Sequence, residues 1–276
     1  MTDLNNAVVL ITGAGGGFGR QMIRQFLAAG SRLILHDLRK DQLTAACADH
    51  ADGSDQVLDS FAADLSDATG CRILFDAVSE SGHCPDILIN NAGIGVGGRL
   101  DLVPRDRWEQ VVQVDLLSPM RLCEMFLPAM IERRSGHIVN IASIAAWIGP
   151  KGLTSYAASK FGLRGFGESL FSDVEEFDIR VSTVYPWFSK TPILDSEQFG
   201  PWDKLEIPED VVTDPADVVE EIISGIRKNR QHIFPDKMAR RIQFMKRHTP
   251  WLLGKVMQRM EKKIRATNSS LRLSAS

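Results

Sequence analysis

The sequence predicts an α/β fold in which a doubly wound parallel sheet forms a single domain. Apolar runs of strand length alternate with segments that carry apolar residues at helical spacing, and this alternation is typical of a parallel sheet covered on both faces. A glycine-rich segment separates the first such strand from the first helix. No Ser- or Gly-rich linker and no internal repeat divides the 276 residues.

The first strand, turn and helix predict a binding site for a dinucleotide. Residues 7–12 form an apolar strand, a glycine-rich turn follows, and residues 20–29 form a helix. Gly13 permits the tight turn, Gly17 lets backbone N–H groups approach a pyrophosphate, and Gly19 lets helix and strand pack closely. The positive end of the helix dipole then faces the phosphates. The alternative is a glycine-rich turn without a ligand.

The remaining elements are read in order from short apolar runs and helical stripes. Strands are expected at residues 32–36, 57–62, 86–90, 136–142, 179–184 and 231–234, and helices at residues 41–49, 68–79, 105–133, 155–177 and 214–228. Pro186 ends the sixth strand, and the last of these helices has acidic residues near its start and basic residues near its end, which suits the helix dipole.

Composition excludes several classes of protein. A hydrophobic content of 44% suffices for a large core, and a net charge of −3 gives no general reason to expect nucleic-acid binding. The four cysteines and six histidines show no spacing typical of metal ligands, so no metal is expected. No signal-peptide pattern and no apolar run of membrane-spanning length is visible, which favours a cytoplasmic protein.

Tyr156 and Lys160 are four residues apart and therefore share one face of a helix. A free phenol loses its proton near pH ~10, and a neighbouring ammonium favours the phenolate by Coulomb attraction. Lowering the phenol pKa by about three units requires roughly 4 kcal/mol. The pair therefore indicates a tyrosine that serves as an acid or base at neutral pH. By itself the spacing also occurs by chance on solvated helices.

Taken together, the ordered motifs resemble the short-chain dehydrogenase/reductase family over roughly residues 5–235. The matching motifs are Thr12-Gly-x-x-x-Gly-x-Gly19, Asp64, Asn90-Asn-Ala-Gly93, Ser143, Tyr156-x-x-x-Lys160, and Pro186 with Thr191. We therefore expect a Rossmann-type catalytic domain over residues 1–235, a C-terminal helical extension over residues 236–276, and a homodimer or homotetramer.

The resemblance implies roles for individual residues. Ser143 orients the substrate oxygen, Tyr156 exchanges its proton, and Lys160 depresses the tyrosine pKa and binds the nicotinamide ribose. Asp64 contacts the adenine, Asn91 lies along the cofactor, and Thr191 holds the carboxamide. The complete set of expected cofactor-binding residues is Gly13, Gly17, Phe18, Gly19, Asp37, Asp64, Leu65, Asn91, Ala92, Gly93, Tyr156, Lys160 and Thr191.

Asp37, at the end of the second strand, favours NAD over NADP. Its carboxylate can accept hydrogen bonds from the ribose hydroxyls and would repel a 2′-phosphate. The glycine loop holds no basic residue. Arg39 is the one nearby cation. Because it could fold back toward a 2′-phosphate, NADP stays open as the alternative.

Two positions depart from the family pattern. Asp115 stands where the family often has Asn, in the middle of the long helix, and we include it among the catalytic residues. Its charge either weakens the pull of Lys160 on Tyr156 or supports proton relay. Trp187 replaces the glycine that usually follows Pro186, which either reshapes the loop near the nicotinamide or presents an apolar wall to the substrate.

Substrate contacts are expected from Ser143, Trp147 and Trp187 within an apolar surrounding. The apolar residues in question are Ile94, Val96, Ile144, Trp147, Ile148, Trp187, Phe188, Ile193, Phe199 and Trp202. They favour a bulky lipophilic secondary alcohol or ketone of steroid, retinoid or long-chain type. The alternative is that several of them are ordinary core residues.

The segment beyond Phe234 is strongly basic. Between residues 236 and 265 it carries Lys or Arg at 237, 240, 241, 246, 247, 255, 259, 262, 263 and 265, against two acidic residues. Two amphipathic helices, one on either side of Pro250, are expected there, with a frayed end at residues 267–276. Such helices suit contact with an anionic membrane surface, and a dimer contact or packing on the subunit is the alternative.

Three functions follow from these patterns. The first is hydride transfer between NAD(H) and a lipophilic secondary alcohol or ketone at a Ser-Tyr-Lys site, with an NADP-dependent carbonyl reductase as its variant. The second is a dinucleotide-binding regulatory protein with little turnover. The third is a peripheral membrane scaffold.

Overall fold

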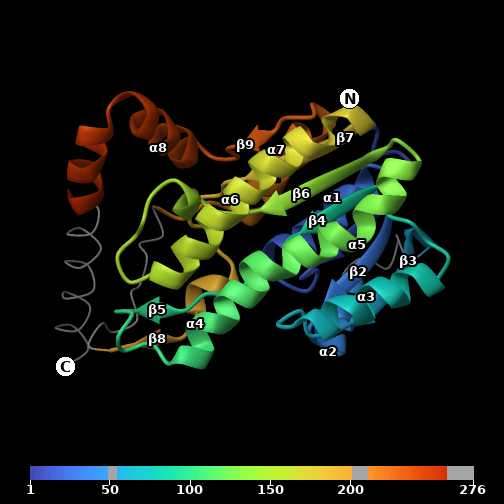
Figure 1. Cartoon of the computed structure of the whole chain (residues 1–276), viewed down its shortest axis with the longest axis horizontal. Helices are drawn as coiled ribbons and strands as arrows, with labels where there is room; N and C mark the ends of the chain where they lie inside the picture. The colour runs from blue at the N-terminus through green and yellow to red at the C-terminus, as the bar shows by residue number, and fades with distance from the viewer. Residues whose placement is uncertain (49–54, 201–210, 260–276) are drawn as a thin grey trace.

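The computed structural model describes residues 1–48, 55–200 and 211–259. Within these ranges a parallel sheet of seven strands forms the centre of the molecule, in the order β3-β2-β1-β4-β6-β7-β9 (Figure 1). The strands are β1 Val8–Thr12, β2 Arg32–Asp37, β3 Val57–Ala62, β4 Ile87–Asn90, β6 Gly136–Ile141, β7 Ile179–Val184 and β9 His232–Ile233. The predicted doubly wound parallel sheet is confirmed.

Helices cover both faces of the sheet. The α-helices of the described ranges are α1 Gly17–Ala28, α2 Lys40–Ala48, α3 Ala68–Glu80, α4 Arg105–Val112, α5 Ser118–Glu132, α6 Thr154–Val174, α7 Pro215–Arg227 and α8 Lys237–His248. One core lies between the sheet and α1, α2 and α7, and the other lies between the sheet and α3, α5 and α6. Central strands such as β1 are buried along their whole length, which explains their continuous apolar sequences.

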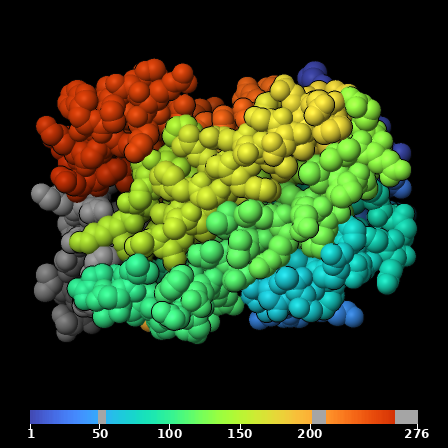
Figure 2. Space-filling view, in the orientation of Figure 1, coloured from blue at the N-terminus to red at the C-terminus, as the bar shows by residue number. Residues whose placement is uncertain are grey.

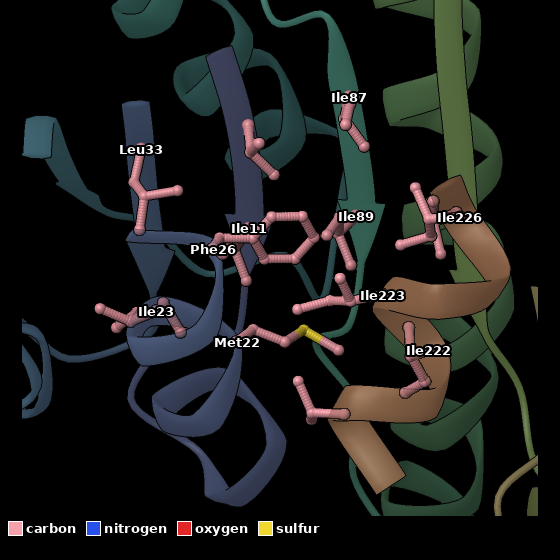
Figure 3. Packing of buried hydrophobic residues seen from close by; sticks show 14 of the residues in the cluster. Ile11, Met22, Ile23, Phe26, Leu33, Ile87, Ile89, Ile222, Ile223 and Ile226 are labelled. Atoms are coloured by element: carbon pink, nitrogen blue, oxygen red, sulfur yellow. The ribbon is translucent and has the colours of Figure 1, made fainter. Parts of the chain in front are cut away.

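Close packing of α1 and α7 on the sheet is visible in Figure 3. Met22 and Phe26 of α1 and Ile222 of α7 reach toward Ile11 and the neighbouring strands. All of these side chains are fully buried. The helical stripe expected for the first helix is therefore the face that α1 buries.

The order of the strands reverses between β1 and β4. The glycine-rich turn follows β1, and Asn91-Ala-Gly93 follows β4, so both motifs meet at the same carboxyl edge of the sheet. Crevices at such switch points are where ligands bind in open α/β sheets. The fold therefore brings together motifs that are about 80 residues apart in sequence.

The structure at residues 105–133 differs from the single long helix that the sequence predicts. A π-helical turn, Gln113–Leu117, separates α4 from α5 and contains Asp115. Single π turns inside helices carry one extra residue per turn and occur frequently at functional sites. The helix expected at 155–177 likewise ends as α-helix at Val174 and continues as a 3₁₀ turn to Phe177.

A small second sheet and a C-terminal extension complete the fold. A small second sheet pairs β5 (Gly97–Gly98) with β8 (Gln198–Phe199), which the sequence pattern does not predict. Beyond β9, α8 and a further helical segment at residues 250–259 form the expected basic helical extension. The expected frayed end at 267–276 lies outside the described residues.

Candidate active site

Ser143, Tyr156 and Lys160 come together at the carboxyl end of β6. Ser143 follows that strand, and its Oγ accepts a hydrogen bond from the Ala145 N–H at 3.1 Å, which caps a short 3₁₀ turn. Tyr156 and Lys160 lie in the first two turns of α6, with the Lys160 Nζ 5.4 Å from the centre of the Tyr156 ring. The Lys160 ammonium also donates to the Ile141 carbonyl at 3.2 Å.

Asp115 lies directly beside Lys160. Its carboxylate is fully buried, and Oδ2 is 3.0 Å from the Lys160 Nζ. The other oxygen, Oδ1, accepts a hydrogen bond from the Ile94 N–H at 2.8 Å. Because the π turn displaces the chain at this point, Asp115 points into the site and forms a buried ion pair with the lysine.

The electrostatic balance differs from the sequence-based expectation. Burial raises the pKa of Tyr156; Lys160 lowers it, the Asp115 charge raises it, and a hydrogen bond from Ser143 lowers it, with a net upward direction. Lys160 lowers that pKa as expected, but burial and Asp115 outweigh its effect. Burial opposes the charge on Lys160, yet Asp115 and Tyr156 hold the pKa of Lys160 above its ordinary value. Burial raises the pKa of Asp115, and the positive charge of Lys160 partly offsets that rise.

The glycine loop fits a dinucleotide phosphate. A Cβ at Gly13, which has φ +65°, would lie 2.8 Å from the Ala92 Cα, and a Cβ at Gly19 would collide with the Gly13 carbonyl. Helix α1 begins after Gly16 with no side-chain cap and no acidic residue in its first turn. The first N–H groups of a helix need partners, and a phosphate supplies them. Phe18, on the same turn, packs against the core.

Thr191 lies against this loop. A Cβ at Gly17 would be 2.5 Å from the Thr191 Cγ2, so the two expected cofactor contacts are neighbours although they are far apart in sequence. Thr12 and Asn91 join the loop to the motif after β4. The Thr12 Oγ1 accepts from the N–H groups of Asn91 and Ala92, and the Asn91 amide donates to the Gly13 carbonyl at 3.0 Å.

Acidic residues follow β2 and β3 on the same edge of the sheet. Asp37 is buried, and its Oδ2 accepts from the Gly15 N–H of the glycine loop at 2.9 Å. Arg39 extends outward to Asp41, 3.4 Å away. Asp64 is exposed, whereas the side chain of Leu65 is buried in the core.

Most of the apolar residues expected near the substrate fall in two clusters, whereas Ile193 belongs to neither and is exposed. Ile94, Val96 and Phe199 pack around Tyr156. Ile144, Ile148, Trp147, Trp187 and Phe188 belong to a second cluster beneath α8. A Cβ at Gly93 would lie 3.6 Å from both Asp115 and Lys160, and Trp202 lies outside the described residues.

Trp187 is held on three sides. Its backbone N–H donates to Asp236 Oδ2 at 2.9 Å, its indole N–H donates to the Val211 carbonyl at 3.0 Å, and its ring is buried under α8. It is not among the described non-glycine residues with positive φ, so it takes ordinary backbone angles. Trp147 packs beneath the Arg164 guanidinium at 3.6 Å. Whether either tryptophan contacts substrate stays a prediction.

Several residues of this site carry no sequence signal. The Ile94 N–H and Ile141 carbonyl act through their backbone, which any residue supplies. Asp236 is recognisable as a helix N-cap, since an aspartate before an apolar stripe is typical of one. Its bond to Trp187, 49 residues away, follows from the fold alone.

Comparison with known proteins decides the family. A family model described as short chain dehydrogenase matches residues 7–200. The chain belongs to the short-chain dehydrogenase family. It is 32% identical over 250 residues to human epidermal retinol dehydrogenase 2, a match that covers 90% of this chain and 79% of the relative.

Solved structures agree with that family. A short-chain dehydrogenase/reductase from Burkholderia phymatum in complex with NAD has a TM-score of 0.78 and 25% identity, over 90% of this chain and 94% of that one. A short-chain dehydrogenase from Sphingobium yanoikuyae in complex with NADPH has a TM-score of 0.77 and 25% identity, over 90% and 95%. This short-chain dehydrogenase is therefore an oxidoreductase that depends on a nicotinamide dinucleotide, as the sequence motifs predict.

Proposed function

We propose that this short-chain dehydrogenase interconverts bulky lipophilic secondary alcohols and ketones, with NAD as its dinucleotide and Ser143, Tyr156 and Lys160 as its catalytic residues. The observation that carries the proposal is the convergence of these three side chains beside the glycine loop at one edge of the sheet.

Each residue has a distinct task in the proposed reaction. The Ser143 hydroxyl hydrogen-bonds the substrate oxygen and fixes its position. Tyr156 takes the hydroxyl proton during oxidation and returns it during reduction. Lys160 lies close enough to the ring to stabilise the phenolate. Asp115 fixes the lysine and sets the charge balance around it.

The dinucleotide would be held by the residues predicted from the sequence. Uncapped N–H groups of α1 suit its pyrophosphate, and the buried Asp37 suits a ribose with a free 2′-hydroxyl. When bound, the nicotinamide accepts or donates the hydride. Positioning and proton transfer are what the protein contributes.

Two observations support a lipophilic substrate. The side chains that pack around Tyr156 are apolar, including Ile94, Val96 and Phe199. The human relative is named for retinol, a bulky apolar primary alcohol, and its name supports the lipophilic character of the substrate alone. Burial of such a ligand is driven by its apolar area, so an apolar surrounding favours it over small polar alcohols.

Replacement of Tyr156 by Phe tests the proposal. Alcohol oxidation, followed at the nicotinamide absorbance with a panel of retinoid, steroid and long-chain alcohols, should fall by about 10²- to 10⁴-fold, the usual share of general acid–base catalysis. The chain has one other tyrosine, the buried Tyr185, and Tyr185→Phe provides the matched control that keeps activity. Turnover that survives in Tyr156→Phe contradicts the proposed role.

A second candidate function is a dinucleotide-binding regulator with little turnover. The observation that favours it is the buried Asp115, whose charge works against phenolate formation at Tyr156. The same substrate panel distinguishes the two, since a regulator binds dinucleotide but turns over no alcohol or ketone with either cofactor.

Cofactor preference is tested at Asp37. Its charge disfavours a 2′-phosphate, so Asp37→Asn should shift the ratio of NAD to NADP dissociation constants toward NADP by about ten-fold or more. Titration of both dinucleotides with wild type and variant measures that ratio. Asp76→Asn, an exposed carboxylate on α3, is the control. A wild-type chain that binds NADP more tightly than NAD contradicts the assignment.

Two further expectations stay proposals. Exposed Met120 on α5 and Phe161 on α6, two helices that run side by side in Figure 1, fit a homodimer or homotetramer built through this face. Sedimentation of the full chain measures the assembly. The cytoplasmic location remains a prediction.

A further inference from the structure

The C-terminal extension packs on the domain through one face only. Ala239 and Ile242 of α8 and Leu253 of the following helical segment are buried on Ile144, Ile148 and Trp187. Asp236 fixes the start of α8, since its Oδ1 accepts from the Ala239 N–H at 2.7 Å. Figure 2 shows the C-terminal helical extension, in red, as one corner of the molecule.

The opposite face of α8 combines an aromatic ring with cations. Phe244 is 59% exposed. Arg241 lies three residues before it, Arg247 three residues after it and Lys237 seven residues before it, so all share its face of the helix. All three cations are exposed, and none forms an ion pair with another described residue. The Phe244 ring lies beside the His248 ring of the same helix, with the two ring centres 4.6 Å apart, and most of its surface faces solvent.

The next helical segment repeats the arrangement. Trp251 is 70% exposed, the largest exposed fraction among the described large hydrophobic residues after Met1. Lys255 follows one turn later and Arg259 two turns later, both exposed. A tryptophan flanked by lysine and arginine is typical of helices that lie in the membrane interface.

Charge identifies the partner. Residues 237–259 hold Lys or Arg at 237, 240, 241, 246, 247, 255 and 259 and no Asp or Glu, within a chain whose net charge is −3. A second copy of this surface would meet like charge, which disfavours self-association through it. An anionic bilayer supplies opposite charge for the cations and an apolar layer for the two rings.

We propose that the outer face of residues 237–259 docks on an anionic lipid bilayer, with Phe244 and Trp251 inserted at the boundary between headgroups and acyl chains. No helix in the described ranges is long and apolar enough to cross a membrane, so the contact is peripheral. Membrane docking is separate from the proposed reaction, and vesicle binding measures it without any catalytic assay.

Vesicle flotation of the full-length chain tests the proposal. Phosphatidylcholine vesicles with about 30 mol % phosphatidylglycerol are compared with pure phosphatidylcholine, at low and at high salt. The variants are Phe244→Ala/Trp251→Ala and Lys237→Gln/Arg241→Gln/Arg247→Gln. The control is Ile73→Ala on α3, which removes a hydrophobic side chain of similar exposure (55%) elsewhere. Circular dichroism verifies that each variant is folded.

The wild type and the Ile73 control should float with anionic vesicles at low salt, and pure phosphatidylcholine should bind them poorly. Removal of three cations should weaken partitioning by about a hundred-fold, from roughly five-fold per cation. Loss of both rings should weaken it by at least about ten-fold. The proposal is overturned if the wild type stays unbound, if the ring variant floats as well as wild type, or if that variant instead dissociates an oligomer in lipid-free sedimentation.

Discussion

At the scale of single residues, Lys160 is shared between two partners. The Asp115 carboxylate lies 3.0 Å from its ammonium, and the Tyr156 ring lies 5.4 Å away. A cation that is already neutralised by a buried carboxylate attracts a phenolate less strongly. The pKa of Tyr156 is therefore raised by burial and by Asp115 although a lysine stands beside it.

Replacement of Asp115 by Asn should move the pH dependence of alcohol oxidation. The change removes the charge that raises the pKa of Tyr156 and keeps an oxygen for the Ile94 N–H. Because phenolate then forms at lower pH, the acid limb of the kcat/KM profile should shift to lower pH and the rate at neutral pH should rise. Asp173→Asn, exposed on α6, should leave the profile in place. An unchanged limb in Asp115→Asn would mean that the carboxylate has no influence on the base.

At the scale of elements, Asp236 joins α8 to the loop after β7. One oxygen caps the helix and the other accepts the Trp187 N–H. The same loop continues to Thr191, which lies against Gly17. A single buried carboxylate thus links the C-terminal extension to a segment expected to contact the dinucleotide.

Asp236→Ala should destabilise the protein more than loss of an ordinary helix cap. Two buried N–H groups lose their acceptor, which costs about 2–4 kcal/mol in the free energy of unfolding. Within the described part of the chain, the Asp214 side chain makes only the helix-capping bond of α7, from the Ala216 N–H at 2.7 Å, and Asp214 is exposed. Asp214→Ala should cost about 1 kcal/mol. Urea unfolding of both variants compares the two costs, and equal losses would refute the double role.

Prediction from sequence succeeded for features that are local in the chain. Buried strands read as apolar runs, and the glycine turn needs its residues because Gly13 takes positive φ. The strand order pairs segments as far apart in sequence as Val9 and Ile87, and the sequence patterns do not predict it. The π turn at Asp115 and the pairing of β5 with β8 depend on packing and were missed. Lys160 lowers the pKa of Tyr156 as predicted, but the net upward direction was not expected, because the extent of burial is not visible in a motif.

At the scale of the whole molecule, two buried histidines couple stability to pH. Burial lowers the pKa of His36 to about 4 and that of His137 to about 3, from an ordinary value of 6.5. Both stay neutral in the folded protein at mildly acidic pH. The unfolded chain takes up those protons as the pH falls below 6.5, so acid favours unfolding.

The free energy of unfolding should therefore fall on acidification. Between pH 7.5 and pH 5 the loss should be about 2 kcal/mol for each of these histidines, measured by urea unfolding at the two pH values. His137→Gln should remove about half of the fall, and the exposed His248→Gln should not. If the free energy of unfolding is the same at pH 7.5 and pH 5, His36 and His137 are not held neutral in the folded protein.

The central place of β1 has a consequence for synthesis on the ribosome. One neighbour, β2, follows within a few dozen residues, but the other, β4, begins only at Ile87. Until then the nascent chain presents an apolar strand edge with unpaired backbone groups, which invites pairing with other chains. The edge of β1 that faces β4 therefore stays open to pairing with other chains until β4 has left the ribosome.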